Sequence, residues 1–313
     1  MSAAGPAWQP RHQVELVAGT PAGGGQDRPA RALIKVLESQ RLVDVPLKLT
    51  NIPGRGGGNG WDYLHRHAED PHVLAISSPT LITNALLGEA GINHTAFTPL
   101  AILYTEYTAF VARADSPIHI SAGLLERLAD PGSLTIALAT AIGNTNHIAL
   151  ARVTQHAGGD VKALKFRVFD SALYAVADVI EGRSDIATIT AVSAAKELAA
   201  GTLRAFAVSA PARLTGQFAQ VPTWHEQSVD CVIGMWRGVI GARGLKPEQV
   251  AFWDNAFTAA AASDDWNAEL AHHYWANTYL DSARTGKFLA QEHVAMQKAL
   301  GDLGLLKAAN SKR

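Results

Sequence analysis

Short apolar runs alternate with amphipathic stretches through most of the 313-residue chain. Residues 14–18 (VELVA) form a run typical of a buried strand, and Leu33, Ile34 and Leu37 then recur at helical spacing. The same pattern predicts further strands at 45–50, 73–77, 134–139, 164–168, 186–189 and 203–208. Because strands that alternate with helices favour parallel pairing, the sequence predicts an α/β fold with a mainly parallel sheet.

The last quarter of the chain is predicted to be helical. Pro247 suits the first turn of a helix, and a second helix is expected to begin at Asp264. Residues 283–307 have the pattern of a final amphipathic helix. The length predicts about two domains, at roughly 150 residues each. Since no low-complexity linker separates them, we expect the chain to cross between the domains more than once.

Composition limits the functions that the chain can have. The 27 Lys and Arg residues nearly balance 28 Asp and Glu residues, which gives no electrostatic basis for binding nucleic acid. Cys231 is the single cysteine, so the sequence excludes an internal disulfide and a cysteine-based zinc site, and it favours a buried, inert thiol. No apolar run reaches the roughly 18 residues of a transmembrane helix. The first residues lack the pattern of a signal peptide.

The signatures of several enzyme classes are absent from the sequence. The glycine spacing fails the dinucleotide pattern Gly-x-Gly-x-x-Gly, and Gly286-Lys287 is followed by Phe288 where a P-loop has Ser or Thr. Neither the serine-hydrolase motif Gly-x-Ser-x-Gly nor the zinc-protease motif His-Glu-x-x-His occurs. The side chains of the close histidine pairs at 65/67 and 272/273 would point in different directions on a helix, so these pairs do not suggest a metal site. We therefore expect no catalytic residue, no bound metal and no cofactor.

A glycine-rich loop follows the first predicted strand. The consecutive glycines 23–25 let a ligand approach the backbone closely. Where such a loop leads into a helix, its N–H groups and the helix dipole form an anion site without a cationic side chain. Asp27 is predicted to cap the helix and hold the loop. The alternative is that the glycines only form a turn.

A second candidate loop spans residues 140–147. It offers donors at a predicted helix start, namely Thr140, Asn144, Thr145 and Asn146, with His147 one step inside. Ordinary N-capping is the alternative. A third loop contains Asp170 and Ser171, which are interpreted as a cap for a helix over 172–180. Because loops at strand C-termini converge on the crevice that binds ligands, two such loops from two domains could hold a carboxylate from both sides.

Two motifs connect these loops to a known family. Residues 21–31 (PAGGGQDRPAR) match P-A-G-G-x-x-D-x-x-A-R, and residues 51–60 (NIPGRGGGNG) match N-x-P-G-x-G-G-x-x-G. Weaker matches follow at Gly143 and His147 and at residues 182–185, 201–208 and 221–226. From about Val14 to the C-terminal helices, the chain resembles the Bug family, the substrate-binding receptors of tripartite tricarboxylate transporters.

The resemblance implies a type II periplasmic-binding-protein (Venus-flytrap) fold, with two α/β lobes and a ligand cleft between them. The implied lobes are residues 1–105 plus 233–313, and residues 106–232. The implied function is non-enzymatic capture of a small organic acid by backbone N–H groups and water. The acid would be a di- or tricarboxylate, an aromatic carboxylate or an acidic amino acid. The implied ligand-binding residues are Thr20, Pro21, Ala22, Gly23, Gly24, Asp27, Ser78, Thr80, Thr140, Gly143, Asn144, Thr145, Asn146, His147, Phe169, Asp170 and Ser171.

The resemblance also implies a location and partners. It implies a periplasmic monomer that is not inserted in the membrane and that supplies the membrane components of a transporter. Because no leader is visible, the alternative is a cytosolic homologue that senses or carries a ligand, and a further alternative is an enzyme acting on an organic acid around His147.

One departure from the family concerns the ligand. Gly19 and Thr20 replace the usual Pro-Phe before the first motif, so an aromatic cleft wall is missing and the ligand is expected to be bulkier or more polar. Arg237, beside Trp236, could be a second carboxylate partner, but a surface arginine is favoured.

Overall fold

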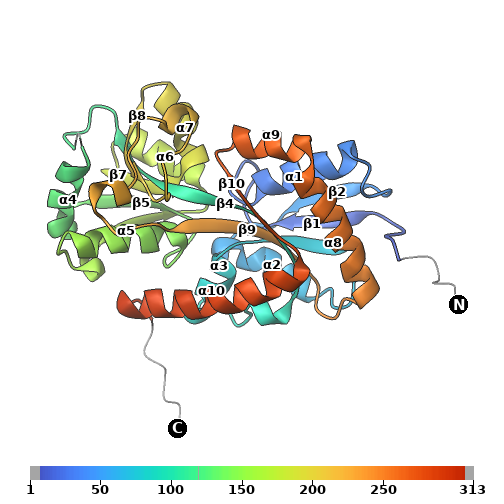
Figure 1. Ribbon diagram of the computed structural model, residues 1–313. Helices are drawn as coiled ribbons and strands as arrows, with labels where there is room; N and C mark the ends of the chain where they lie inside the picture. Colours follow the sequence, from blue (N-terminus) through green and yellow to red (C-terminus); the bar gives the residue numbers. More distant parts are fainter. Residues whose placement is uncertain (1–7, 119, 307–313) are drawn as a thin grey trace, which may run out of the picture. The chain divides into compact units, whose positions relative to one another are not determined.

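The computed structural model describes residues 8–118 and 120–306, and this part of the chain divides into two compact units. Unit 1 contains the residues up to Ala85, Ala90–Thr105 and Trp236–Val294. Unit 2 contains Leu86–Glu89, Glu106–Met235 and the residues from Ala295 onward. In each unit, helices cover both faces of a sheet (Figure 1).

The sheet of unit 1 has the strand order β2-β1-β3-β9-β4, and β10 also pairs with β4. Its strands are β1 (Val14–Ala18), β2 (Leu47–Asn51), β3 (Val73–Ser77), β4 (Thr98–Arg113), β9 (Gly234–Gly241) and β10 (Ala276–Leu280). β1 is parallel to β2 and β3, but β9 is antiparallel to β3 and β10 is antiparallel to β4. The expectation of a mainly parallel sheet is therefore wrong, because the hydrophobic period marks a strand without giving its direction.

Alternation along β1 places side chains in two separate cores. Leu16 faces the core shared with α1, α8 and α9, where Trp253 is fully buried. Val17 faces the opposite core, which contains Trp61 of α2. The helices of this unit are α1 (Asp27–Ser39), α2 (Gly58–His65), α3 (Thr80–Leu86), α8 (Pro247–Ala262), α9 (Asp264–His272) and α10 (Ser282–Asp302), the last of which ends in unit 2. The predicted helix starts at Pro247 and Asp264 are confirmed.

Unit 2 has the strand order β8-β4-β7-β5-β6. The strands not yet given are β5 (Thr135–Ala139), β6 (Lys165–Phe169), β7 (Ile186–Thr190) and β8 (Leu203–Val208). β5 is parallel to β6 and β7, whereas β4 is antiparallel to β7 and β8. The predicted strands of this unit lie within a residue or two of those observed.

The helices of unit 2 are α4 (Ser121–Ala129), α5 (Thr145–His156), α6 (Ala172–Ile180) and α7 (Ala191–Ala199). Three of them, α5, α6 and α7, follow the C-terminal ends of the parallel strands β5, β6 and β7, whereas α4 follows the antiparallel strand β4. α4 packs with α5 on one face of the sheet, and α6 packs with α7 on the other. Since β5 and β6 are parallel neighbours, the loops that lead into α5 and α6 lie at the same edge of the sheet. Within the described ranges, no helix has both the length and the apolar character needed to cross a bilayer.

Candidate functional site

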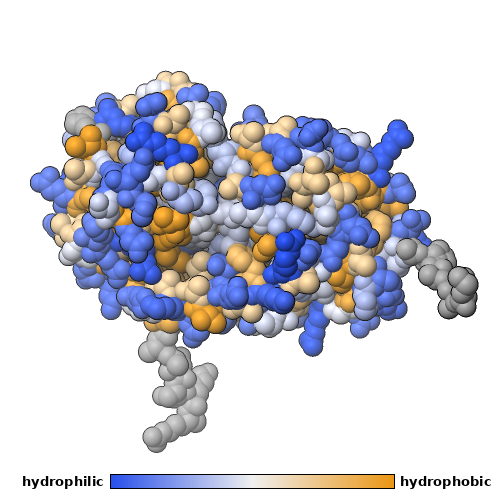
Figure 2. Space-filling view, viewed as in Figure 1, coloured by the Kyte–Doolittle hydropathy of each residue, from blue (hydrophilic) through white to orange (hydrophobic). Residues whose placement is uncertain are grey.

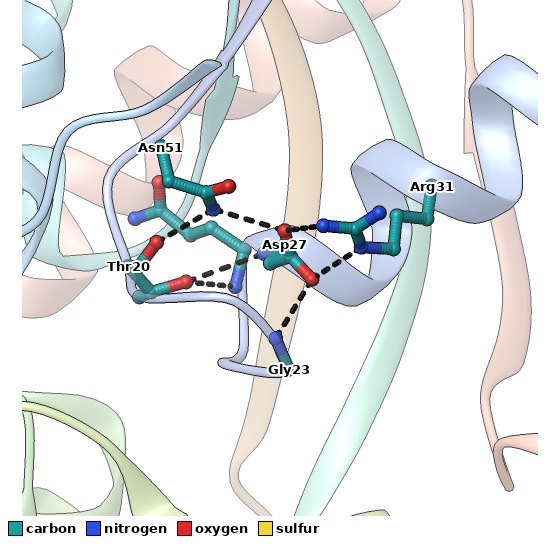
Figure 3. A network of polar contacts seen from close by, with 6 residues as sticks. Thr20, Gly23, Asp27, Arg31 and Asn51 are labelled. Atoms are coloured by element: carbon teal, nitrogen blue, oxygen red, sulfur yellow. Dashed lines mark hydrogen bonds and ion pairs between the residues drawn. The ribbon is translucent and has the colours of Figure 1, made fainter. Parts of the chain in front are cut away.

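The first glycine-rich loop joins β1 to α1, and a buried carboxylate determines its shape (Figure 3). Asp27 Oδ2 accepts hydrogen bonds from the N–H of Gly23 at 2.8 Å and from Arg31 Nε at 2.7 Å. Its Oδ1 accepts from Arg31 Nη2 at 3.1 Å and from Asn51 Nδ2 at 2.9 Å. Burial raises the pKa of this carboxyl, but these hydrogen bonds outweigh burial and hold the pKa below its ordinary value. Asp27 therefore remains an anion that ties the loop to two neighbouring segments.

The start of α1 is capped by Thr20 and not by Asp27. Thr20 Oγ1 accepts hydrogen bonds from the N–H groups of Gln26 at 3.1 Å and Asp27 at 3.2 Å. The prediction that Asp27 caps the helix is wrong, because Asp27 is already the first helical residue and its carboxylate turns back to the loop. Gln26 closes the base of the loop, since its Oε1 accepts from the N–H of Gly19 at 2.8 Å.

Several backbone N–H groups of this loop are used within it. That of Gly23 donates to the buried carboxylate, and that of Gly24 donates to Pro21 O at 2.9 Å. The N–H of Ala22 makes no hydrogen bond among the described residues, and Ala22 is exposed. A Cβ on Gly24 would lie 2.7 Å from that of Thr20, so the loop has no room for a side chain there. Internal hydrogen bonds thus fix the conformation of the loop and leave Ala22 exposed at its tip. The ligand contacts predicted for this loop stay predictions.

The second glycine-rich loop supports the first through direct backbone contact. A Cβ on Gly19 would lie 2.5 Å from the Cα of Gly57, which itself has a φ of 106° that favours glycine. Thr80 Oγ1 donates to Gly56 O at 2.8 Å and lies 2.8 Å from Ser78 Oγ. In this structure Ser78 and Thr80 brace the second loop, and their contact with a ligand stays a prediction.

Arg237 of β9 lies against the first loop. Its side chain is buried, and its Nε donates to Gly25 O at 3.0 Å. The expectation of a surface arginine is therefore wrong. The segment GMWRGVIG was not recognised as a strand, although one charged residue inside an apolar run is typical of a buried side chain with a fixed partner. Arg237 thus helps to position the loop from a distant part of the sequence.

In unit 2, Asn144 organises the loop between β5 and α5. Its Oδ1 accepts from the N–H of His147 at 2.9 Å, and its Nδ2 donates to Ala139 O at 2.6 Å and to Thr140 Oγ1 at 3.0 Å. Thr140 and Gly143 both have positive φ values, 70° and 80°, which turn the chain sharply into the helix. The alternative of ordinary N-capping is therefore confirmed for Asn144.

His147 is a buried, neutral support for this loop. Its Nδ1 accepts from the N–H of Gly143 at 2.8 Å, so the ring proton of the neutral form is on Nε2. That nitrogen has no hydrogen-bond partner among the described residues. The ring packs edge-on against Phe166, with centroids 4.6 Å apart. Burial lowers the pKa of His147 to about 4, which leaves the side chain uncharged at neutral pH.

The first turn of α5 offers three hydrogen-bond donors that have no acceptor in the described part of the chain. They are the N–H groups of Thr145 and Asn146 and the hydroxyl of Thr145, which is fully buried. The side chain of Asn146 is held separately, because its Oδ1 accepts from Thr108 Oγ1 at 2.8 Å. Donors grouped at the positive end of a 12-residue helix are suited to a carboxylate or another small anion.

The third loop adjoins the second. The N–H of Thr140 donates to Phe169 O at 2.7 Å, which fixes the start of one loop to the end of β6. Ser171 is the N-cap residue of α6 but makes no side-chain capping bond, and Asp170 is exposed. The interpretation of Asp170 as a cap is therefore wrong, because the residue lies one position too early.

Two residues that shape the site were not among those predicted from the sequence. Asn51 and Gln26 both form hydrogen bonds with the first loop. Each lies within one of the two family motifs, but the motif alone indicated no role for it. The predicted inert thiol is confirmed, since Cys231 is buried and burial raises its pKa to about 12. In residues 8–118 and 120–306, no group of three or more His, Cys, Asp or Glu side chains could hold a metal ion.

The fold is that of type II periplasmic binding proteins. The structure of Rpa4515 from R. palustris with adipate has a TM-score of 0.86 to this chain, with 21% identity over 94% of this chain and 98% of the other. A TctC solute-binding protein from Polaromonas has a TM-score of 0.67, with 26% identity over 94% and 99% of the two chains.

The sequence matches show the family. The family model TctC, described as the tripartite tricarboxylate transporter family receptor, matches residues 35–305, and the chain belongs to this family. Among its relatives, Protein BugT of Bordetella pertussis is 24% identical over 81% of this chain and 78% of its own length. The family consists of periplasmic solute-binding receptors and not of enzymes. The predicted family and fold are confirmed.

Proposed function

We propose that this protein is a periplasmic receptor that captures a small organic acid for uptake by a tripartite tricarboxylate transporter. The observation that carries this proposal is the first turn of α5, where a buried hydroxyl and two N–H groups have no acceptor among the described residues. A buried hydroxyl without a partner costs about 1–3 kcal/mol. A carboxylate oxygen would relieve that cost, and the helix dipole would favour its charge.

The first loop of unit 1 is proposed to bind a second polar end of the ligand. Ala22 presents its N–H at the tip of a loop whose shape is already fixed by internal hydrogen bonds. Because Asp27 is an anion paired with Arg31, it supports the loop and does not itself attract a carboxylate. A loop that needs no ordering on binding saves the entropy that a flexible loop would lose.

The side chains near these loops support binding rather than catalysis. His147 is neutral, and its Nδ1 is already bonded to the N–H of Gly143, so it is not poised as a base with a nucleophile. The thiol of Cys231 is buried and protonated. The site thus provides hydrogen-bond donors and shape, which are what a receptor needs.

The test is titration calorimetry of the purified protein with di- and tricarboxylates, aromatic acids and acidic amino acids. Thr145→Val removes the buried hydroxyl and should weaken binding of the preferred acid by about 10-fold or more, since a hydrogen bond to a charged group contributes about 1.5–3 kcal/mol. Thr154→Val is the matched control, because its hydroxyl donates within the same helix to Leu150 O at 2.9 Å.

The ligand-free stabilities separate binding from folding. Thr145→Val should leave the melting temperature of the ligand-free protein unchanged or raised, because the hydroxyl that it removes has no partner in the described chain. Failure of every acid to bind would contradict the proposal, and so would an equal loss of affinity in Thr145→Val and Thr154→Val.

A further inference from the structure

A cavity of about 400 Å³ lies in unit 1, between β4, β10 and the first half of α10. Seven residues line it, all of which belong to unit 1: Ile102, Thr105, Asn277, Thr278, Tyr279, Leu280 and Phe288. They include no residue of the loops before α1, α5 or α6. Pockets that bind small molecules have volumes of roughly 300–1,000 Å³, and an engineered cavity of only about 150 Å³ holds benzene. The cavity is therefore large enough for a ligand of one or two rings.

The cavity lies at an irregularity of β10. Asn277 pairs with Tyr104 of β4, but Leu280 pairs with Ile102, so β10 has one more residue than β4 between the two pairs. Such a β-bulge bends the strand and changes the direction of its side chains, and bulges are common beside functional sites. All four residues from 277 to 280 line the cavity. The bulge thus gives this part of β10 side-chain positions that a regular strand would not have.

The inner walls of the cavity are apolar. Ile102 is buried, whereas Leu280 and Phe288 are partly buried. The ring of Phe288 is held edge-on by Trp236, with centroids 5.8 Å apart. Thr278 is exposed, so the cavity opens on the side of β10. Figure 2 shows orange apolar patches between blue residues on the unit that contains α8 and α9, so apolar groups of this unit do reach the surface. These walls favour an apolar body.

Two threonine hydroxyls give the cavity one polar point. Thr105 Oγ1 lies 2.9 Å from Thr278 Oγ1. Each hydroxyl carries one proton, and only one proton can lie between the two oxygens, so the other remains free to donate. Neither hydroxyl has another hydrogen-bond partner among the described residues. The pair is therefore suited to a single hydroxyl or carbonyl oxygen of a ligand.

The charges around the cavity disfavour an ion. None of the seven lining side chains is charged at neutral pH, because burial raises the pKa of the Tyr279 hydroxyl. Near Tyr279, Arg284 Nε donates to Asp281 Oδ2 at 3.1 Å, so this cation is already paired. The carboxylate of Asp254 also lies near Tyr279 and would repel an anion. An ion in the cavity would lose hydration without gaining a partner of opposite charge.

We propose that this cavity is a second ligand site, which binds an uncharged molecule with a body of one or two apolar rings and a single hydroxyl or carbonyl oxygen. The rings lie against Ile102, Leu280 and Phe288, and the oxygen bonds to the hydroxyl pair of Thr105 and Thr278. The proposal goes beyond the receptor function and does not depend on it, because the two sites share no residue.

The experiment is titration calorimetry of the full-length protein with 2-naphthol, which is uncharged at pH 7, and with 2-naphthoate, an anion with the same rings. 2-Naphthol should bind to one site with a dissociation constant of about 1 mM or lower. Thr278→Trp fills the opening and should weaken this binding about 10-fold or more. Asn267→Trp is the matched control, since it places the same side chain at an exposed position of α9 outside the cavity. It should leave the binding of 2-naphthol unchanged.

The outcomes separate this proposal from the receptor function. Thr145→Val should not affect 2-naphthol, whereas any binding of 2-naphthoate should fall in Thr145→Val and not in Thr278→Trp. Failure of 2-naphthol to bind, equal binding by Thr278→Trp, or loss of binding in Thr145→Val would overturn the proposal and leave carboxylate capture intact. If Thr278→Trp folds poorly, nuclear magnetic resonance of the unmodified protein decides: 2-naphthol should shift the amide resonances of residues 277–280, and the absence of such shifts would also overturn the proposal.

Discussion

Replacing Asp27 with Asn should loosen the first glycine-rich loop at a cost that the structure allows to be worked out. Each carboxylate oxygen accepts two hydrogen bonds, so an amide loses two acceptor contacts whichever way it is turned. One lost partner is the N–H of Gly23 or the amide of Asn51, and leaving such a group unsatisfied costs about 1–3 kcal/mol. The other is Arg31, whose side chain is 59% exposed, so this loss adds less than about 1 kcal/mol. We expect Asp27→Asn to destabilise the protein by about 1–4 kcal/mol.

Urea titration followed by tryptophan fluorescence and by circular dichroism measures this cost, provided that the two transitions coincide. Arg31→Gln is the control, since it removes the exposed partner and leaves the carboxylate with Gly23 and Asn51; it should cost less than about 1 kcal/mol. Affinity for the preferred acid should fall in Asp27→Asn more than in Arg31→Gln. A cost for Asp27→Asn no larger than that of Arg31→Gln would refute the view that the buried charge holds the loop.

Three further predictions test other parts of the structure. Gly24→Ala should lower the stability by about 1–3 kcal/mol and impair ligand binding, because its Cβ would lie 2.7 Å from the side chain of Thr20. Gly91→Ala is the control, since its Cβ would have no atom within 4 Å, and it should lower the stability less in the same thermal melts. His147 takes up a proton near pH 6.5 in the unfolded state but only near pH 4 in the folded state, so the unfolded state binds more protons between these two pH values. The free energy of unfolding should therefore fall by up to about 3 kcal/mol as the pH is lowered through this window. Thermal melts of His147→Gln should show a smaller fall. Trp236→Phe removes the indole N–H that donates to Glu292 Oε2 at 3.0 Å, and burial already raises the pKa of that carboxyl. The variant should therefore lose about 1–3 kcal/mol of stability at neutral pH and regain part of it in acid, where the carboxyl is protonated. A loss of stability that does not depend on pH would exclude this explanation.

The sequence predicted those parts of the site whose chemistry is local. The loop into α5 was found because Asn, Thr and Gly at a strand end signal a capped turn, and Asn144 does cap that helix. The first loop was found from its glycines, but its cap was assigned to the wrong residue. Thr20 lies seven residues before the first helical residue, and only the folded path of the loop brings its hydroxyl to Gln26 and Asp27.

Contacts between distant segments could not be predicted from the sequence. Arg237 reaches Gly25 across 212 residues of chain, and the backbone contact of Gly19 with Gly57 depends on how two loops pack. The long strand β4 was also missed. Its 16 residues are mostly buried and have no simple alternation, so the period of 2 that marks a half-buried strand is absent.

The assignment of chain segments to the two units has a consequence for synthesis. Neither unit is contiguous in sequence, since unit 1 needs residues up to Val294 and unit 2 needs residues from Ala295 onward. In unit 1, β9 lies between β3 and β4, so a chain that ends before Gly234 leaves the edge of β3 without its partner. A ribosome-bound chain therefore cannot complete either unit until nearly all of it has emerged. Completion of either unit should therefore come late, and a chaperone that binds extended segments would have a long interval in which to act.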